Sequence, residues 1–343
     1  MPVRLPLLFL SAEDVRRALP MSAAIAAMRL AFRQLADGHV SLPPRQHIES
    51  PGNNGRALVM TCHSTAHQLF SLKFITLFGD NRSKGLPLIQ SIVMLADGAT
   101  GEPLVVMDGA VLTSIRTGAA SGLATDLLAR PDAAEIAVFG AGVQARTQLE
   151  AICTVRPIRR GYVYDPDLAA AERMASEMST LLNRPIECVA SPAQALEHAD
   201  VVCTATTSPV PVFDDAGLKH GTHINAIGSY RPQVSEIPPA TVCRSRIVVD
   251  HRDSALEEAG DLLGPLRQGL LAGSQFWAEL GDVLLGRSPG RENPGDITIF
   301  KSVGVAIQDL CAAACALENA RHLQLGVRLP NGVGALPPVS RGD

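Results

Sequence analysis

The sequence predicts an α/β protein with two domains, one built on a doubly wound parallel sheet and the other of α+β class. A glycine-rich turn, AVFGAGVQA at 137–145, stands between a short apolar run and a segment with helical spacing of apolar residues. From residue 165 onward helix-like and strand-like segments alternate, which is typical of a parallel sheet. Residues 56–107 instead contain short β-rich runs separated by glycine-bearing turns, which predicts a hairpin-rich sheet.

The composition favours a globular enzyme. The chain has 343 residues, which is enough for two hydrophobic cores, with 46% hydrophobic residues, 19% charged residues and a formal charge of −4. These values give no support for a nucleic-acid partner or a membrane surface. Seven cysteines without paired short spacings indicate reduced thiols and a cytoplasmic location. Cys311 and Cys315 are expected in the core, and no metal site is expected.

Two helical regions flank the β-rich part of the chain. Residues 11–37 predict two helices, with Ser11 and Ser22 as their N-caps. Residues 113–129 predict a helix rich in small side chains, which leads directly into the strand before the glycine turn. The last residues, LPPVSRGD at 336–343, are expected to form a frayed tail.

The glycine turn fits the pattern G-x-G-x-x-G/A, with Gly140, Gly142 and Ala145 at the defining positions. The pattern alone is weak, but here a buried strand is expected before it and a helix after it, as a dinucleotide site requires. Gly140 would allow the tight turn, and Gly142 would let backbone N–H groups approach a pyrophosphate. The helix starting near Val143 would present its positive end to the phosphates.

A second predicted strand, RRGYVYDPD at 159–167, brings Asp165 about twenty residues past the end of this motif. An acid at that position binds a ribose 2′-OH and disfavours a 2′-phosphate, so it favours NAD over NADP. The alternative is that Asp165 caps a helix. Further along, TATTS at 204–208 follows a strand's carboxyl end, where ligands of such sheets bind.

The chain resembles the ornithine cyclodeaminase/mu-crystallin family over nearly its whole length. The resemblance rests on PPR at 43–45, LKF at 72–74, GEPLVVMDGAVLTSIRTGAAS at 101–121, GAGVQA at 140–145, HINAIGS at 223–229, AELGDVLLGR at 278–287 and ITIFKSVGVAIQDL at 297–310. It implies an NAD(P)-binding Rossmann domain over 121–310. A second domain, 1–120 together with 311–335, would bind the substrate and form a homodimer, leaving 336–343 as the tail.

The resemblance also implies the site residues. Arg45, Lys73 and Arg116 would bind the carboxylate of an amino or imino acid, as basic side chains suit that role; the alternative for each is a surface salt bridge. Lys73, Arg116 and Ser229 are the candidate catalytic residues. The implied cofactor site contains Gln90, Thr117, Gly140, Gly142, Val143, Gln144, Asp165, Thr204, Ala226, Gly228 and Ser302, of which Gln144 and Ser302 would otherwise be helix caps.

One departure from the family pattern bears on the reaction. Ornithine cyclodeaminases carry an aspartate just after the glycine of a GGD-like turn, whereas this chain reads GSYRPQVSE, with Ser229 and Tyr230 there and no acid before Glu236. Mu-crystallin has a similar turn, and it and its bacterial relatives reduce cyclic ketimines. Mu-crystallin lacks the acid at the end of its second strand and takes NADPH, while Asp165 argues for NADH.

The resemblance therefore favours an NAD(P)H-dependent reductase of Δ1-pyrroline-2-carboxylate or Δ1-piperideine-2-carboxylate, forming L-proline or L-pipecolate. The positioned iminium is already electrophilic, so reduction needs no dedicated carboxylate base. The alternatives are ornithine cyclodeaminase, alanine dehydrogenase and a mu-crystallin-like binding protein without catalysis. In a cyclodeaminase, a residue from elsewhere in the chain, such as His63 or Glu236, could substitute for the missing base.

Overall fold

A computed structural model describes residues 6–271 and 276–329. The expected tail at 336–343, and the end of the second expected domain at 330–335, lie outside these ranges. The chain divides into two compact units. Unit 1 comprises the residues up to Ala23, Gly38–Thr113 and those from Ala306 onward, and unit 2 comprises Ala24–Asp37 and Ser114–Val305. This division falls at Thr113 and Val305, where the expected domain boundaries were residues 120 and 310.

Unit 1 is built on a mixed sheet, sheet A, in which strands join in the order β16-β1-β7-β6-β5-β4-β2 and β3 pairs with β4. Among the described strands of sheet A, only β1 and β7 form a parallel pair. Hairpins therefore make up its centre, as the β-rich texture predicted. The strands are β1 (Leu7–Leu10), β2 (Val40–Ser41), β3 (Gln46–Ser50), β4 (Gly55–Ser64), β5 (Leu69–Phe78), β6 (Ile89–Asp97), β7 (Pro103–Asp108) and β16 (Val327–Leu329).

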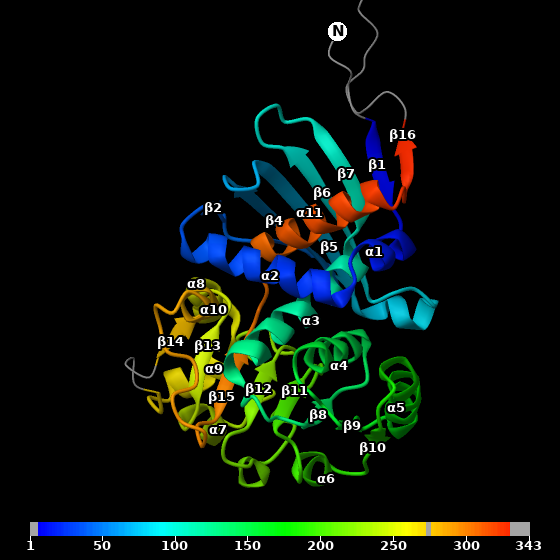
Figure 1. The fold of residues 1–343 in the computed structure, drawn as a ribbon. Coiled ribbons are helices and arrows are strands. Elements are labelled where there is room, and N and C mark those ends of the chain that lie inside the picture. Colours follow the sequence, from blue (N-terminus) through cyan, green and yellow to red (C-terminus); the bar gives the residue numbers. More distant parts are fainter. Residues whose placement is uncertain (1–5, 272–275, 330–343) are drawn as a thin grey trace, which may run out of the picture. The chain divides into compact units, whose positions relative to one another are not determined.

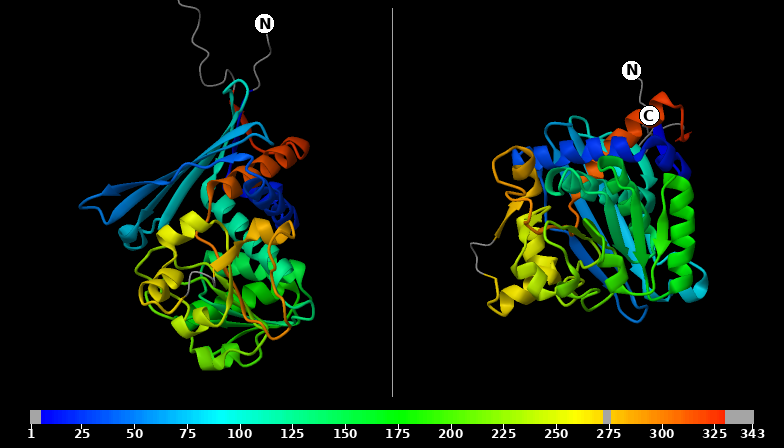
Figure 2. Two further views of the ribbon diagram at one scale, coloured as in Figure 1. Left: turned by 90° about the vertical axis from the view of Figure 1, so that its left-hand side faces the viewer. Right: turned by 60° about the horizontal axis from the view of Figure 1, so that its bottom comes forward.

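The C-terminal helix α11 (Ala306–His322) crosses one face of sheet A, over β4, β5 and β6 (Figure 1). Successive side chains of a strand point to opposite faces of the sheet. In β5, Ser71, Lys73 and Ile75 are therefore buried on the face that α11 covers, whereas Phe70 and Phe74 on the other face are 45% and 39% exposed. The second view shows the same helix beside the sheet (Figure 2). The face of sheet A that points away from α11 therefore exposes large apolar side chains, among polar ones such as Gln90.

The other helices near the start of the chain follow local signals, with two differences from expectation. Helix α1 (Ala12–Ala18) begins after Ser11, which forms a reciprocal capping box with Asp14. Helix α2 (Met21–Ala36) already includes Ser22, so the prediction of Ser22 as an N-cap was wrong. Pro20 precedes this helix, and its fixed φ suits a helix start.

Helix α3 (Gly109–Leu128) begins earlier than the expected residue 113. The Asp108 carboxylate at the end of β7 accepts a hydrogen bond from the Val111 N–H at 2.8 Å, which satisfies one of the free donors of the first turn. A short 3-10 helix, η1 (Gly79–Lys84), connects β5 to β6.

Unit 2 is a doubly wound sheet, sheet B, in which all the described strands run parallel in the order β10-β9-β8-β11-β12-β15-β13-β14. The order reverses between β8 and β11, which marks the topological switch point. The α/β prediction is thus confirmed. The strands are β8 (Glu135–Phe139), β9 (Arg160–Tyr164), β10 (Ile186–Cys188), β11 (Val201–Thr204), β12 (His223–Ala226), β13 (Arg246–Val249), β14 (Phe276–Glu279) and β15 (Thr298–Lys301).

Helices cover both faces of sheet B, so its strands are apolar on both sides. In β8, Ile136 and Val138 pack against the helices of one face, while Ala137 and Phe139 pack into the core of the other. The first face is covered by α4 (Val143–Val155) and α5 (Leu168–Leu182). The second is covered by α6 (Pro192–Leu196), α7 (Pro239–Cys243), α8 (Arg252–Glu258) and α9 (Gly260–Arg267); α10 (Leu280–Leu284) and the 3-10 helix η2 (Asp215–Gly217) complete the unit.

Candidate active site

The glycine turn after β8 has the backbone that a dinucleotide site needs. Gly140 has φ +101°, and a Cβ there would lie 2.7 Å from the Ala205 carbonyl oxygen, so only glycine fits. Gly142 is the N-cap of α4, provides no side-chain cap, and has open space around the position of a Cβ. The first N–H groups of α4 are therefore free of a capping side chain and face an open cradle, which suits a pyrophosphate.

The first turn of α4 adds two features to this cradle. The apolar side chain of Val143 is 68% exposed. The Gln144 side-chain oxygen is buried and accepts no hydrogen bond from the described residues. Gln144 lies inside α4, so the alternative of a helix cap does not hold for it. An exposed valine and an unsatisfied buried oxygen at a helix N-terminus are both consistent with a bound group covering this turn.

Asp165 directly follows β9 and is tied to the glycine turn. One carboxylate oxygen accepts from the Ala141 N–H at 2.9 Å, and the other accepts from the Asp167 N–H at 2.9 Å. Asp167, not Asp165, is the N-cap of α5, accepting from the Ala170 N–H. The helix-cap alternative for Asp165 is therefore excluded. Each carboxylate oxygen keeps a further lone pair that can accept from a ribose hydroxyl.

Three of the predicted cofactor residues lie where β11 and β12 end: Thr204 and Ala226 are the last residues of these strands, and Gly228 lies in the loop after β12. The Thr204 hydroxyl donates to the Glu236 carboxylate at 3.0 Å, and the Gly228 N–H donates to the same carboxylate at 2.7 Å. Ala226 is fully buried, and its carbonyl accepts from the Ser302 N–H at 3.3 Å. The structure thus brings these residues together at the carboxyl ends of two adjacent strands, where ligands of doubly wound sheets bind.

Glu236 anchors these loops, whereas the sequence indicated it only as a possible substitute base. It is fully buried, and burial together with the nearby Asp261 raises the pKa of its carboxyl, while Lys301 opposes that rise. Lys301, also fully buried, lies 2.7 Å from Asp261. The sequence did contain a signal for Lys301, because a lysine within the apolar run ITIFK resembles Lys73 within SLKFITLF.

Ser229 has its hydroxyl committed within the protein. It is buried, and its hydroxyl donates to the Val234 carbonyl at 2.6 Å. Ser302 is similar, because its hydroxyl donates to the Asp250 carboxylate at 2.7 Å, and the same carboxylate oxygen accepts from the Gly304 N–H at 2.7 Å. Both serines therefore hold loops at the carboxyl edge of sheet B.

Arg116 lies on the part of α3 that belongs to unit 2 and is 5% exposed. Gly304 has φ +82°, and a Cβ there would lie 3.0 Å from both terminal nitrogens of the Arg116 guanidinium. The guanidinium therefore lies directly against the loop after β15. Thr117, the next residue, is 7% exposed. The burial of Arg116 excludes the surface salt bridge that was the alternative for this residue.

In unit 1, Lys73 forms an ion pair with Asp309 of α11. The ammonium lies 2.6 Å from the carboxylate, and both side chains are buried at 3% and 1% exposure. The surface salt bridge is excluded here too. Asp309 was missed from the sequence because it stands far along the chain from Lys73.

The other two predicted residues of unit 1 lie nearer the surface. Arg45 is half-buried on the loop between β2 and β3, and Gln90 of β6 is exposed. The register pairs Gln90 with Thr76 and Lys73 with Val93, so Gln90 and Lys73 leave opposite faces of sheet A. The roles of Arg45 and Gln90 remain predictions.

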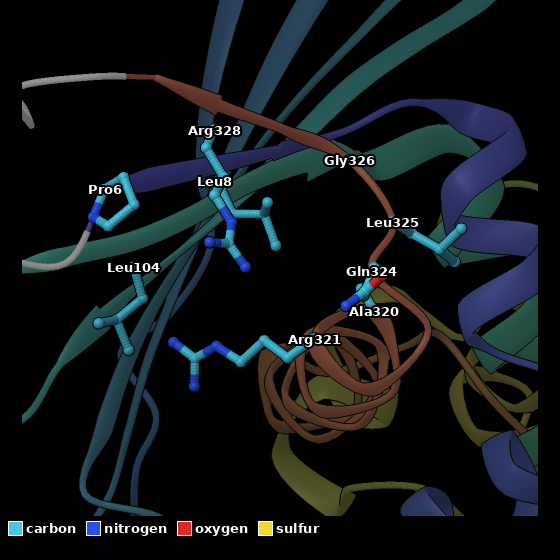
Figure 3. Close-up of a pocket in the computed structure, with 9 residues that line it drawn as sticks. All are labelled: Pro6, Leu8, Leu104, Ala320, Arg321, Gln324, Leu325, Gly326 and Arg328. Carbon is cyan, nitrogen blue, oxygen red and sulfur yellow. The ribbon is translucent and has the colours of Figure 1, made fainter.

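Unit 1 also has a pocket of about 610 Å³ at the far end of α11 (Figure 3). Arg321 and Arg328 point into it from the end of α11 and from β16. Arg321 stands twelve residues after Asp309 on the same helix, a separation of about 18 Å along the axis. None of the predicted site residues lines this pocket, so it is distinct from the Lys73–Asp309 pair.

Across 6–271 and 276–329, no group of three or more potential ligands is arranged to hold a metal ion. No helix within these ranges is both long and apolar enough to span a membrane. All seven cysteines are free thiols, and Cys311 is buried while Cys315 is half-buried.

The model of the ornithine cyclodeaminase/mu-crystallin family matches residues 7–324. This chain belongs to that family. It is 36% identical over 324 residues to a Δ1-pyrroline-2-carboxylate reductase of Bacillus cereus, covering 94% of this chain and 99% of the relative. The resemblance inferred from the separate motifs is thereby confirmed.

Two solved structures of relatives share its fold. The Δ1-pyrroline-2-carboxylate reductase of Thermococcus litoralis, in complex with NADH and L-proline, is 38% identical, with a TM-score of 0.91 and coverage of 94% of this chain and 100% of that one. An archaeal alanine dehydrogenase dimer with bound NAD is 33% identical, with a TM-score of 0.88 and coverage of 95% and 99%. For this member of the ornithine cyclodeaminase/mu-crystallin family, both units therefore have counterparts in known structures.

Proposed function

We propose that this protein is a reductase that converts Δ1-pyrroline-2-carboxylate to L-proline with a reduced nicotinamide dinucleotide. Relatives at 36% and 38% identity that carry this name match nearly the whole chain, and one of them was solved with NADH and L-proline. The nicotinamide cofactor is supported by the relatives solved with NADH or NAD and by the open glycine turn before α4.

The observation that carries the choice of reaction is the turn after β12. It presents Ser229 and Tyr230 where the ornithine cyclodeaminases of this family carry an aspartate. The Ser229 hydroxyl is committed to Val234, and the Glu236 carboxylate accepts five hydrogen bonds from its own loops. Neither is available as a base. We therefore assign Ser229 to the support of this turn, and the site fits a reaction that starts from a ready electrophile.

The bound cofactor supplies a hydride from C4 of its dihydronicotinamide ring, which adds to the C=N carbon while the C=N electron pair moves to nitrogen. Because the iminium nitrogen already carries a proton, the product is the neutral amine, which solvent protonates. The basic residues Arg45, Lys73 and Arg116 are proposed to bind the substrate carboxylate and to orient the ring for this transfer.

On the cofactor side, we propose that Gly140, Gly142, Val143 and Gln144 bind the pyrophosphate and that Asp165 binds the ribose. The carboxylate of Asp165 would repel a 2′-phosphate, so the proposed cofactor is NADH. The remaining proposed contacts, around the nicotinamide, are Gln90, Thr117, Thr204, Ala226, Gly228 and Ser302.

We further propose that the protein is a homodimer and that a second copy covers the exposed face of sheet A. Phe70, Phe74 and Ile92 are 45%, 39% and 50% exposed, and the register sets Phe74 beside Ile92. An apolar patch of this kind is rarely left open on a monomer. Light scattering should report twice the mass of one chain, and Phe74→Asp should lower it; a wild-type mass of one chain would contradict the dimer.

The test of the reaction uses purified protein with NADH and with NADPH in separate assays. Each is mixed with Δ1-pyrroline-2-carboxylate or with pyruvate plus ammonia, and the loss of absorbance of the reduced cofactor is followed. We expect NADH to be oxidised in the presence of the cyclic imine, and we expect L-proline as the product. Faster oxidation with pyruvate and ammonia would instead favour an alanine dehydrogenase, whose archaeal relative is also similar.

A further inference from the structure

Glu236 is a buried acid that joins the loops at the carboxyl ends of β11 and β12. One of its carboxylate oxygens accepts from the Thr206 N–H and from the Thr206 hydroxyl, each at 2.7 Å. The other accepts from the Gly228 N–H at 2.7 Å, the Ser229 N–H at 3.1 Å and the Thr204 hydroxyl at 3.0 Å. A single carboxylate therefore sets the position of one loop relative to the other.

Asp261 and Lys301 extend this hydrogen-bond network from Glu236 to the turn at Ser229. One Asp261 oxygen accepts from the Glu236 N–H at 2.6 Å and the Ile237 N–H at 3.1 Å, and the other lies 2.7 Å from the Lys301 ammonium. The same ammonium donates to the Ser229 carbonyl. Glu236, Asp261 and Lys301 are each at most 1% exposed.

Burying three charged groups is costly, and well-packed apolar residues often serve stability as well or better. The gain from this cluster is a defined loop geometry, since its hydrogen bonds to Thr206, Gly228 and Ser229 fall on the two loops and its bond to Thr204 falls on the last residue of β11. Gly228 shows how closely they fit: a Cβ there would lie 2.5 Å from the Glu236 carboxylate. The carboxylate occupies the space that a side chain at this position would need.

The two loops lie on the side of sheet B that receives the nicotinamide in a doubly wound dinucleotide fold. Asp165 follows β9, on the half of the sheet that binds the adenosine ribose, whereas β11 and β12 begin the other half across the switch point. We propose that Glu236, Asp261 and Lys301 are positioning residues that hold these two loops in the geometry that seats the nicotinamide for hydride transfer. The inference rests on the proposed function.

The test compares Glu236→Gln and Thr206→Val with the wild-type protein. Glutamine has the size of glutamate but turns an NH2 group toward backbone donors, so one loop must move. Thr206→Val removes one hydroxyl, which donates to Glu236 and accepts from the Ser208 N–H, and keeps the shape of the side chain. It is the variant expected to fold if Glu236→Gln does not. The readouts are the Kd of NADH by fluorescence, kcat/KM with Δ1-pyrroline-2-carboxylate, and the isotope effect with NADH deuterated at the transferred position.

For Glu236→Gln we expect kcat/KM to fall about 100-fold, the scale for a reacting group misplaced by about 1 Å. The deuterium isotope effect should increase, because a misplaced nicotinamide makes hydride transfer limiting, and NADH should bind more weakly. For Thr206→Val we expect the same directions and a loss of about tenfold, since the two hydrogen bonds of one hydroxyl are removed, each worth about 1 kcal/mol, and the backbone N–H of Thr206 still binds Glu236.

Asp200→Asn is the matched control. In the wild-type protein, the Asp200 carboxylate accepts hydrogen bonds from the Ala134 and Glu135 N–H groups at 2.9 and 3.2 Å. It therefore ties β8 to β11 at the opposite, amino end of the same sheet. Asp200→Asn should lower the melting temperature without changing the isotope effect or the Kd of NADH. A purely structural role for Glu236 would give this same result in Glu236→Gln, and would overturn the inference.

The two possible failures are distinguishable. If the wild-type protein does not reduce the cyclic imine, the proposed function fails, and the Kd of NADH still reports on the loops. If the wild-type protein reduces it, and Thr206→Val and any folded Glu236→Gln keep the wild-type isotope effect and Kd, the positioning role is wrong.

Discussion

The Lys73 ammonium lies 2.6 Å from the Asp309 carboxylate, with both side chains buried between sheet A and α11. The pair spans 236 positions of sequence, so it links the hairpins of unit 1 to the C-terminal helix. A buried pair of this kind is costly to break from one side, because the remaining charge loses its partner. It is also often replaceable by apolar side chains. These two properties separate its structural role from its functional one.

We therefore expect Asp309→Asn to lower the free energy of unfolding by about 3–5 kcal/mol, the range for removing one partner of a buried pair. The double variant Lys73→Met with Asp309→Leu should recover much of that stability. If Lys73 binds the substrate carboxylate, the double variant should remain defective in imine reduction. Urea unfolding and steady-state kinetics on the same samples measure both effects. Recovery of activity along with stability would place Lys73 in a purely structural role.

Arg116 is expected to contribute through its guanidinium. Arg116→Ala should lower kcat/KM. The corresponding rise in activation free energy should be about 2–5 kcal/mol, the scale for truncating one partner of a buried charged contact. Arg116→Lys keeps the charge but loses the planar fork, so it should recover only part of the loss. Kinetics at saturating NADH measure the effect, with the melting temperature as a check on folding. Wild-type turnover in a folded Arg116→Ala protein would remove this residue from the substrate site.

Asp165→Ser should shift the cofactor preference toward NADPH, because it removes a carboxylate that would repel the 2′-phosphate. The measurement is the ratio of kcat/KM with NADH to that with NADPH. Asp167→Ala is the control, since Asp167 caps α5 only two positions away. It should cost about 1 kcal/mol in stability without changing the cofactor ratio. An unchanged ratio in Asp165→Ser would contradict the ribose assignment.

His223 should make the protein sensitive to acid. It is fully buried in β12, and burial, with a smaller effect of the Arg291 charge, lowers its pKa to about 3. Its pKa in the unfolded chain is about 6.5. As the pH falls below that value, the unfolded state takes up a proton that the native state does not. Its contribution to stability is therefore present above about pH 6.5 and is lost as the pH falls toward 3.

The free energy of unfolding should thus fall by up to about 1.4 kcal/mol per pH unit from this group within that window. His223→Gln should reduce the slope, whereas His198→Gln, at a residue whose side chain is 56% exposed, should leave it unchanged. Urea titrations at a series of pH values between about 6.5 and 4 measure the slope. Equal slopes in all three proteins would show that His223 takes up its proton in the folded state as well.

The sequence was informative wherever function depends on neighbouring residues. The strand–glycine–helix pattern located the turn at Gly140 and Gly142, and the distance to Asp165 predicted the acid that the structure ties to the Ala141 N–H. Lys73 and Arg116 stood out as charges among apolar or small residues, and both are buried.

The contacts that sequence reasoning missed are tertiary: the Asp309 pair was not foreseen, and Glu236 was considered only as a substitute base. Asp309 pairs with a lysine of a strand far away in the chain, and Glu236 holds loops that lie up to 32 positions before it. No local spacing encodes such partners. The helix starts at Met21 and Gly109 were misplaced for a local reason, since Pro20 and Asp108 were not recognised as helix-start signals.

The last prediction concerns the base that this chain lacks: the protein should release no ammonia from L-ornithine in the presence of NAD, while it oxidises NADH with the cyclic imine. Deamination needs a group that takes a proton from the substrate ammonium and later activates water. The turn offers only the hydroxyls of Ser229 and Tyr230 in place of a carboxylate, and the Ser229 hydroxyl donates to the Val234 carbonyl. The buried Glu236 carboxylate already accepts hydrogen bonds from five donors of the protein.

His63 is the other residue that the sequence left open as a base. Its ring packs against Phe70 at 4.4 Å, and the register pairs the two residues across β4 and β5. Because Phe70 and Lys73 stand an odd number of positions apart on β5, they leave opposite faces of sheet A, and His63 shares the face of Phe70. His63 is therefore on the far side of the sheet from Lys73. Ammonia release from L-ornithine at a rate comparable to imine reduction would restore the cyclodeaminase and require a base outside these residues.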